Sequence, residues 1–281
     1  MHAHDRAADR TRIRAILHPT DFSEGSEVAF AHALKLALAS RAHLEILHAA
    51  LHEEPAAQRY CPRVRETLLA WGALPDADPG APGVNVQTVL RIGEPPAAAI
   101  LDELDTSGAD LMVLATGARE GLDRLLNTGI SEPVSRLGHV STLFLPPGVE
   151  GFVRADDGKV TLARILVPSN HHPDPQVAVD VAAMIADVLD VSPLQLCTLF
   201  VGDEAAMPTV TLPTHPGWIV RRWYEGGEVV DAILDTAMAW QADLIVMGSR
   251  GHDSVLDTLR GSTVERVLRR AVCPVLVVPV T

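Results

Sequence analysis

An internal repeat constrains the fold of this chain more than any other feature. Three stretches recur at an offset of 133 residues: 99–102 with 232–235, 109–115 with 242–248, and 141–146 with 274–279. Nearer the start, residues 15–21 match residues 164–170 at an offset of 149. Ordered matches across most of both halves indicate duplication of one domain. The fall in offset from 149 to 133 indicates that the second copy has lost about 16 residues in its middle.

Each copy alternates short apolar strand segments with amphipathic helix segments. In the first copy we expect strands near 13–18, 43–50, 85–91, 110–115 and 141–146, and helices near 26–40, 60–72, 95–106 and 129–138. In the second copy we expect strands near 163–168, 194–201, 218–223, 243–248 and 274–279, and helices near 175–190, 227–240 and 262–271. Ser23 is the expected N-cap of the first helix. Because this alternation predicts βαβ units with right-handed crossovers, the fold class is α/β, with two tandem five-stranded, mostly parallel, doubly wound domains.

The expected domains are residues 1–148 and 160–281. They are separated by the Pro146-Pro147-Gly148 turn and a polar, glycine-bearing stretch that runs to about Lys159. Between the second and third expected strands of the second copy, Asp203–Gly217 carries prolines at 208, 213 and 216. Proline interrupts helices, so the second helix is the part that we expect the second copy to lack.

The composition limits the partners of the chain. Its apolar share of 47% with only 4% aromatic residues is typical of parallel sheets covered by helices. A formal net charge of −13 argues against nucleic acid and anionic membranes, which such a surface repels. No apolar run reaches the roughly 18 residues that span a membrane, and Met1 to Arg14 has no apolar signal core. The 3 cysteines lie far apart without a CxxC pair, which favours a reduced, cytoplasmic setting.

A glycine-bearing loop in the second copy is the motif that points to a ligand. Gly248-Ser249-Arg250-Gly251 follows the fourth expected strand, and after a gap of 9 residues Gly261-Ser262-Thr263 opens a helix. Glycines permit positive φ and close approach of a ligand, and successive amides form an anion-binding concavity. A helix N-terminus favours phosphate, and open α/β sheets bind ligands at the carboxyl ends of their strands. The pattern therefore predicts a phosphate-binding loop, although a simple strand-to-helix turn also has this composition.

The spacing Gly-x-x-Gly, 9 residues, Gly-Ser/Thr resembles the nucleotide-binding signature of the universal stress protein family. Residues 17–26 resemble the first strand and turn of that family, and the resemblance covers about residues 12–280 as two copies. It implies an adenine nucleotide alpha hydrolase-like fold. In members that bind ATP, the aspartate after the first strand lies at the adenine–ribose end, and the glycine loop and the Ser/Thr hold the phosphates.

The resemblance implies that the second copy binds ATP, alone or with Mg²⁺. The implied ligand-binding positions are Asn170, Gly248, Arg250, Gly251, His252, Gly261, Ser262 and Thr263. Asn170 stands where the family has aspartate, and its amide oxygen can still accept a hydrogen bond from a base or ribose edge. Arg250 offers bidentate geometry to phosphate. For His252, phosphate contact and a solvated position both remain open.

The first copy keeps the aspartate and lacks the loop. Asp21 is present, but the positions aligned with the loop are Ala115, Ala118, Thr128 and Gly129. Alanine resists positive φ, and its Cβ crowds the place of the phosphates. We expect the first copy to bind ATP weakly or not at all, with Asp21 serving as a remnant turn residue or an anchor of the helix start rather than as a ligand.

The family also implies an assembly, because the last strands of its members pair between subunits. Thr142–Pro146 and Val275–Pro279 are therefore expected to pair within this one chain as an internal pseudo-dimer. Such pairing covers two sheet edges. A homodimer of the whole chain is also open.

Three functions remain open. The first is a stress-response sensor or regulator that binds an adenine nucleotide and an unidentified protein partner. The second is a nucleotide-independent interaction scaffold. The third, a slow ATPase, is the least supported because no base or metal-binding carboxylate cluster stands near the loop; we therefore favour a non-enzymatic role.

Other chemistry-bearing residues have structural interpretations. His48 with His52, and His171 with His172, lack a zinc-like spacing and are expected to be loop or core histidines. The recurring aspartates are expected at strand entries and on a helix surface: Asp110 with Asp243, and Asp102 with Asp235. Trp218, Trp223, Tyr224 and Trp240 are expected to pack in the core or at an interface, with Trp218 and Trp223 as alternative walls of a pocket.

Overall fold

A computed structural model of the chain describes residues 12–52, 63–74, 84–116, 140–250 and 263–280. The first copy contains β1 (Ala15–Pro19), α2 (Glu24–Ser40), β2 (His43–Ala50), α4 (Val64–Ala70), β3 (Asn85–Ile92), α5 (Pro96–Ser107), β4 (Leu111–Ala115) and β5 (Ser141–Leu145). These elements lie close to the expected ranges. The helix expected near 129–138 lies outside the described residues.

The second copy repeats this order with one replacement. It contains β6 (Arg164–Ser169), α8 (Pro175–Val188), β7 (Leu194–Val201), β8 (Trp218–Glu225), α9 (Val229–Trp240), β9 (Leu244–Arg250), α11 (Thr263–Leu268) and β10 (Val275–Val280). Between β7 and β8 the chain forms one 3-10 turn, Glu204–Ala206, where the first copy has α4.

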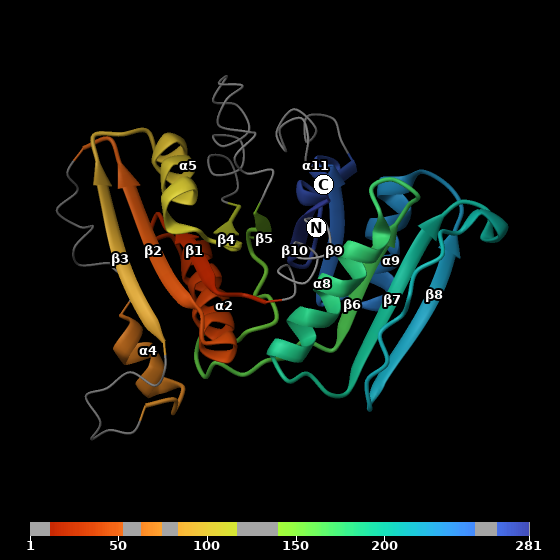
Figure 1. Cartoon of the computed structure of the whole chain (residues 1–281), viewed down its shortest axis with the longest axis horizontal. Coiled ribbons are helices and arrows are strands. Elements are labelled where there is room, and N and C mark those ends of the chain that lie inside the picture. The colour runs from red at the N-terminus through yellow and green to blue at the C-terminus, as the bar shows by residue number, and fades with distance from the viewer. Residues whose placement is uncertain (1–11, 53–62, 75–83, 117–139, 251–262, 281) are drawn as a thin grey trace, which may run out of the picture.

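All the strands join one ten-stranded sheet in the order β3-β2-β1-β4-β5-β10-β9-β6-β7-β8. Neighbouring strands are parallel except β5 and β10, which pair antiparallel with Val275 opposite Phe144 and Val277 opposite Thr142. Figure 1 shows the two halves side by side across this seam, with β3 and β8 as the outer strands. The predicted α/β class and the pairing of the last strands within one chain are confirmed.

Helices cover both faces of the sheet. The buried residues of α2 and α8 form one apolar cluster with the strands, and those of α5, α9 and α11 form another on the opposite face. The large, fully buried side chains are mainly Leu and Ile, as the aromatic-poor composition predicts. No helix of the described residues is long and apolar enough to cross a membrane.

Equivalent polar contacts recur at equivalent places of the two copies. Asp110 Oδ2 accepts a hydrogen bond from the Arg14 amide at 2.9 Å, and Asp243 Oδ2 accepts bonds from the Ala163 and Arg164 amides at 2.8 Å. Each aspartate thus holds the amide that leads into the first strand of its copy. The expected structural role at the strand entries is confirmed.

The chain between the copies is an ordered hairpin that packs on the first copy. Val153 bridges to Val160, and the side chain of Phe152 is fully buried. The Phe152 and Val153 amides donate to His32 Nε2 on α2 at 2.9 and 3.1 Å. His32 Nδ1 donates in turn to the Val28 carbonyl at 2.8 Å, which fixes the neutral tautomer. The stretch expected as a polar boundary therefore contains a buried aromatic anchor.

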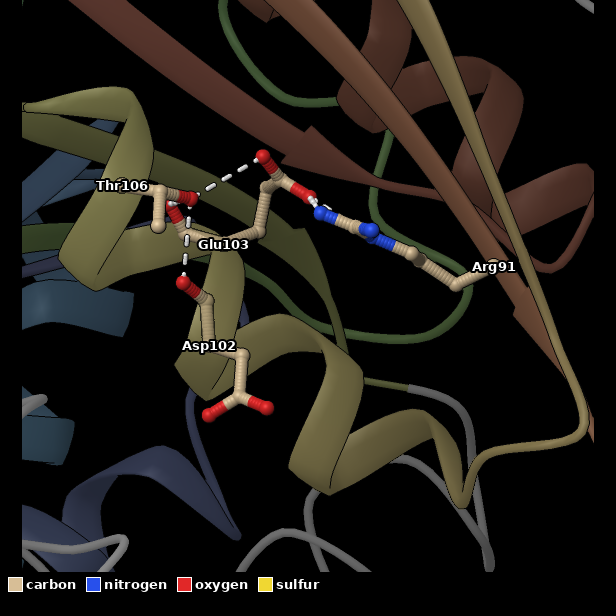
Figure 2. A network of polar contacts seen from close by, with 4 residues as sticks. All are labelled: Arg91, Asp102, Glu103 and Thr106. Atoms are coloured by element: carbon tan, nitrogen blue, oxygen red, sulfur yellow. Dashed lines mark hydrogen bonds and ion pairs between the residues drawn. The ribbon is translucent and has the colours of Figure 1, made fainter.

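A buried carboxylate and an arginine link the outer strand β3 to α5 (Figure 2). Glu103 Oε2 accepts hydrogen bonds from Arg91 Nη2 at 2.7 Å and Arg91 Nε at 3.0 Å, and Oε1 accepts one from Thr106 Oγ1 at 3.2 Å. Glu45 on β2 is also buried beside this pair. Burial, the negative charge of Glu103 and a hydrogen bond to it raise the pKa of Glu45 to about 7, and the Arg91 charge opposes this.

Candidate functional site

A cavity of about 260 Å³ lies at the carboxyl ends of the central strands of the second copy. Strands β7 and β8 follow β6 on one side of it in the sheet, whereas β9 and β10 lie on its other side. The β6–β9 border is therefore the point where the strand order reverses direction. Open α/β sheets bind ligands at such points. The residues that line the cavity are Pro168, Ser169, Asn170, His172, Pro173, Pro175, Leu199, Phe200, Val201, Val229, Ile233, Met247, Gly248, Ser249, Thr263 and Val264.

Asn170 follows β6 and lines the cavity. Its Oδ1 accepts a hydrogen bond from the His171 amide at 2.7 Å, and His171 Nε2 bonds to the Ala206 carbonyl at 2.8 Å. One lone pair of the amide oxygen is therefore already engaged by the backbone. The two N–H donors of the amide and the remaining lone pair are the groups that Asn170 can offer to a ligand.

Gly248 lies within β9, at the inner wall of the cavity. Its φ lies outside the left-handed region, so the expectation that this glycine supplies a positive φ is wrong. Close approach favours glycine here, since a Cβ would lie 3.2 Å from Pro173 Cγ, which is tighter than usual, and 3.4 Å from Val280 Cγ2. This contact was not predictable from the motif, because Pro173 lies 75 positions earlier in the chain.

Ser249 is a candidate site residue to which the motif assigns no role of its own. Its side chain is 5% exposed, it lines the cavity, and its Oγ has no hydrogen-bond partner among the described residues. The neighbouring Ser169 Oγ differs, because it donates to the Leu199 carbonyl at 3.1 Å. An unpaired buried hydroxyl costs about 1–3 kcal/mol, so a ligand atom that bonds to it recovers this free energy. The only signal in the sequence was its place between two motif glycines.

The remaining predicted positions divide into two groups. Thr263 begins α11 and lines the cavity, so the structure brings it together with Asn170 and Gly248. Arg250 ends β9 with its backbone opposite Val280. The Arg250 side chain and the residues Gly251, His252, Gly261 and Ser262 lie outside the part of the chain that the structure describes.

Two exposed ion pairs join α11 and the residues just after it to the first turn of α9 and its N-cap. Arg266 Nη1 lies 2.8 Å from Glu228 Oε1, and Arg270 Nη1 lies 2.7 Å from Asp231 Oδ1. Glu228 also caps α9, because its Oε2 accepts bonds from the Val230 and Asp231 amides at 2.8 and 3.1 Å. Thr263 of α11 and Val229 and Ile233 of α9 all line the cavity, so these contacts join two elements of its wall.

The same place in the first copy is organised around Asp21. Its Oδ1 accepts bonds from Ser23 Oγ and Ser26 Oγ at 2.6 Å and from the Ser23 amide at 3.0 Å. Burial alone would raise the pKa of Asp21, but these hydrogen bonds outweigh burial and lower it. Ser23 caps α2 through the Ser26 amide. The expected roles of Ser23 as the N-cap and of Asp21 as an anchor of the helix start agree with these contacts.

The two copies differ in charge at this place. Among the described residues that line the cavity of the second copy, none is acidic, whereas the first copy carries the Asp21 carboxylate. A cavity without carboxylates suits an anionic ligand.

No group of three or more His, Cys, Asp or Glu side chains in the described ranges is arranged to hold a metal ion. Burial raises the pKa values of Cys197 and Cys273 to about 12, so neither supplies a thiolate near neutral pH.

Comparison with known proteins gives the family. The model of the universal stress protein family matches residues 12–146 and 204–279. The chain belongs to this family. A Thermus aquaticus protein described as "Universal stress protein in QAH/OAS sulfhydrylase 3'region" is 46% identical over 52 residues, which are 18% of this chain and only 38% of that relative.

Solved structures of other universal stress proteins share the complete architecture. One from Archaeoglobus fulgidus aligns with a TM-score of 0.58 over 94% of this chain and 97% of its own length, at 20% identity. A protein from Pseudomonas aeruginosa described as a putative universal stress protein aligns with a TM-score of 0.60 over 96% and 94%, at 15% identity. At these identities the likeness is one of fold.

Proposed function

We propose that this universal stress protein binds ATP, or a related adenine nucleotide, in the cavity of its second copy and acts as a nucleotide-responsive regulator in the cytoplasm. The observation that carries this proposal is the hydroxyl of Ser249, which is buried at a cavity next to Gly248 and has no hydrogen-bond partner among the described residues. A binding site that lacks its ligand leaves such a polar group without a partner.

The chemistry of the cavity residues fits an adenine nucleotide. Leu199, Val201 and Ile233 provide apolar surface for a base, while Asn170 and Thr263 provide hydrogen-bonding groups. The absence of a carboxylate among the described lining residues is compatible with phosphates, and Arg250 is the candidate cation for them. Mg²⁺ would enter with the nucleotide, because the described residues supply no carboxylate cluster for it.

A regulator of this kind responds to the nucleotide through its own stability and surface. A ligand at 100 times its Kd stabilises the folded state by about 2.7 kcal/mol. Arg266 of α11 and Arg270 just beyond it pair with Glu228 and Asp231, so a ligand that shifts α11 through Thr263 would also shift exposed side chains on the surface of the second copy. A partner that recognises this surface would then distinguish the bound from the free protein.

Calorimetric titration of ATP into Ser249→Ala tests the proposal. We expect this variant to bind ATP about 10-fold more weakly than the wild type, which corresponds to about 1.4 kcal/mol. Its stability without nucleotide should be equal or higher, because the substitution removes an unpaired buried hydroxyl. This opposite behaviour of affinity and stability separates a ligand contact from a structural one.

Two glycine variants complete the experiment. Gly248→Ala should also weaken ATP binding, since its Cβ would crowd Pro173 at the cavity wall. Gly226→Ala is the matched control, because a Cβ there would meet nothing within 4 Å. If ATP, ADP and AMP all fail to bind the wild type, the nucleotide-independent scaffold replaces this proposal. If ATP binds Ser249→Ala and Gly248→Ala as tightly as it binds the wild type, the site is assigned to the wrong cavity.

A further inference from the structure

A second hollow of the second copy lies outside the proposed nucleotide site. It has a volume of about 710 Å³ and runs between the outer strand β8 and α9. Its lining residues are Arg222, Trp223, Tyr224, Glu225, Gly226, Gly227, Glu228, Asp231, Ala232, Asp235, Thr236, Ala239 and Trp240. We refer to it as the β8–α9 groove. Helix α9 separates it from the nucleotide cavity, to which the same helix contributes Val229 and Ile233.

Aromatic side chains and small residues shape the groove. Trp223 and Trp240 are half-buried and meet edge to face, with ring centroids 5.1 Å apart and planes at 69°. Ala232 and Ala239 leave the helix side shallow, and a Cβ on Gly226 or Gly227 would meet nothing within 4 Å. The exposed π faces attract cations, most strongly on tryptophan.

The groove also carries unbalanced negative charge. Of its carboxylates, Glu228 and Asp231 are paired with Arg266 and Arg270. The side chains of Glu225 and Asp235 have no ion pair or hydrogen bond among the described residues. Arg222 does not balance them, because its Nη2 donates to the carbonyl of Val210 at 2.8 Å, and Val210 belongs to the apolar cluster on the opposite face of the sheet from α9.

The first copy shows which group occupies the equivalent place. Arg91 pairs with Ala49 in β2, and Glu225 pairs with Val201 in β7, so the two hold the same register position of their copies. The repeat at 133 residues makes Glu103 and Thr106 equivalent to Thr236 and Ala239.

In the first copy, therefore, the guanidinium of Arg91 fills the space between the outer strand and the helix and is bound by Glu103 (Figure 2). The second copy has a carboxylate, Glu225, at the position of that arginine. It keeps Asp235 where the first copy has Asp102, and it places tryptophan faces beside the opening. The space is open and acidic, and the guanidinium of Arg222, the one arginine among the described lining residues, is bound at Val210 away from α9.

We propose that the β8–α9 groove binds a small organic cation with a guanidinium head group, which takes the place that Arg91 fills in the first copy. The carboxylates of Glu225 and Asp235 bind the head group, and the faces of Trp223 and Trp240 contact it or its alkyl chain. This proposal is independent of the nucleotide site.

Titration with butylguanidinium, followed by tryptophan fluorescence and calorimetry, tests the groove. Butylurea is the matched probe, because it has the same shape and no charge. We expect saturable binding of butylguanidinium and at least about 10-fold weaker binding of butylurea, since the cation–π and carboxylate contacts are lost. Equal binding of the two probes, or no binding of butylguanidinium at millimolar concentration, would overturn the proposal.

Variants locate the probe in the groove. Asp235→Asn and Glu225→Gln should each weaken butylguanidinium binding about 5- to 10-fold, because each removes one exposed carboxylate that faces the ligand. The double variant Glu225→Arg/Thr236→Glu rebuilds the arginine–glutamate pair of the first copy and should abolish binding. Asp203→Asn is the control, since Asp203 is exposed, makes no cap bond and lies outside the groove. Undiminished binding to the double variant, checked as folded by circular dichroism, would contradict the assignment.

Discussion

Replacing His32 by alanine is expected to lower the free energy of unfolding by about 3–5 kcal/mol, which urea denaturation measures. His32 is fully buried, and its Nε2 accepts the amides of Phe152 and Val153. The alanine variant leaves both amides without this hydrogen-bond acceptor. It also creates a cavity beside the ring of Phe152, which packs edge to face on His32 with ring centroids 4.6 Å apart.

Two further variants separate these causes. His32→Gln should recover part of the loss, because the glutamine amide oxygen reaches close to the place of Nε2 and can accept a hydrogen bond. His52→Ala is the control, since His52 is exposed, and it should change the stability by less than about 0.5 kcal/mol. An equal, small effect of His32→Ala and His52→Ala would show that the hairpin is not anchored through His32.

Acid is expected to destabilise the protein through two buried histidines. Burial lowers the pKa of His18 to about 4, although a hydrogen bond to the Val113 carbonyl and the charge of Asp21 oppose it. Burial likewise lowers the pKa of His32 to about 4, against the bond to Val28. Because the unfolded chain takes up these protons near pH 6.5, stability is complete above that pH and falls as the pH approaches 4, by about 3 kcal/mol for each histidine.

The contribution of Glu45 to stability has the opposite pH dependence. Its pKa is raised to about 7, so its contribution is complete below pH 4.5 and is lost as the pH rises through 7. Between pH 7 and 4 the two histidines together outweigh this one carboxyl group, and we expect a net loss of about 3 kcal/mol. Urea denaturation across this range measures it. His32→Gln should show a shallower decline than the wild type, and an identical slope would contradict the role of His32.

The repeat made most of the architecture predictable. Matches at fixed offsets located equivalent strands in both copies, and the family resemblance indicated that β5 and β10 pair. Contacts between distant segments were not predictable, because neither periodicity nor composition records which side chains meet. The hydrogen bond between His32 and Phe152 joins residues that are 120 positions apart. Because of it, the stretch between the two copies, which was expected to be polar, packs against the first copy.

The candidate site was predictable in part for the same reason. Motif spacing indicated Gly248 and Thr263, and the aligned turn indicated Asn170; all three line one cavity. A positive φ at Gly248 was wrong, and its close neighbours Pro173 and Val280, which come from other elements, were not predictable from the motif. The unpaired state of Ser249 and the open β8–α9 groove depend on three-dimensional packing, which only the structure displays.

The central claim is that the second copy alone holds the adenine nucleotide, and photolabelling with 8-azido-ATP tests it most directly. After irradiation and proteolysis, mass spectrometry identifies the labelled peptides, and excess ATP serves as the competitor. We predict that ATP-protected label lies in peptides of residues 160–281, beside Asn170 or Gly248. ATP-protected label in peptides of residues 12–146, or an equal distribution between the two copies, would contradict the account.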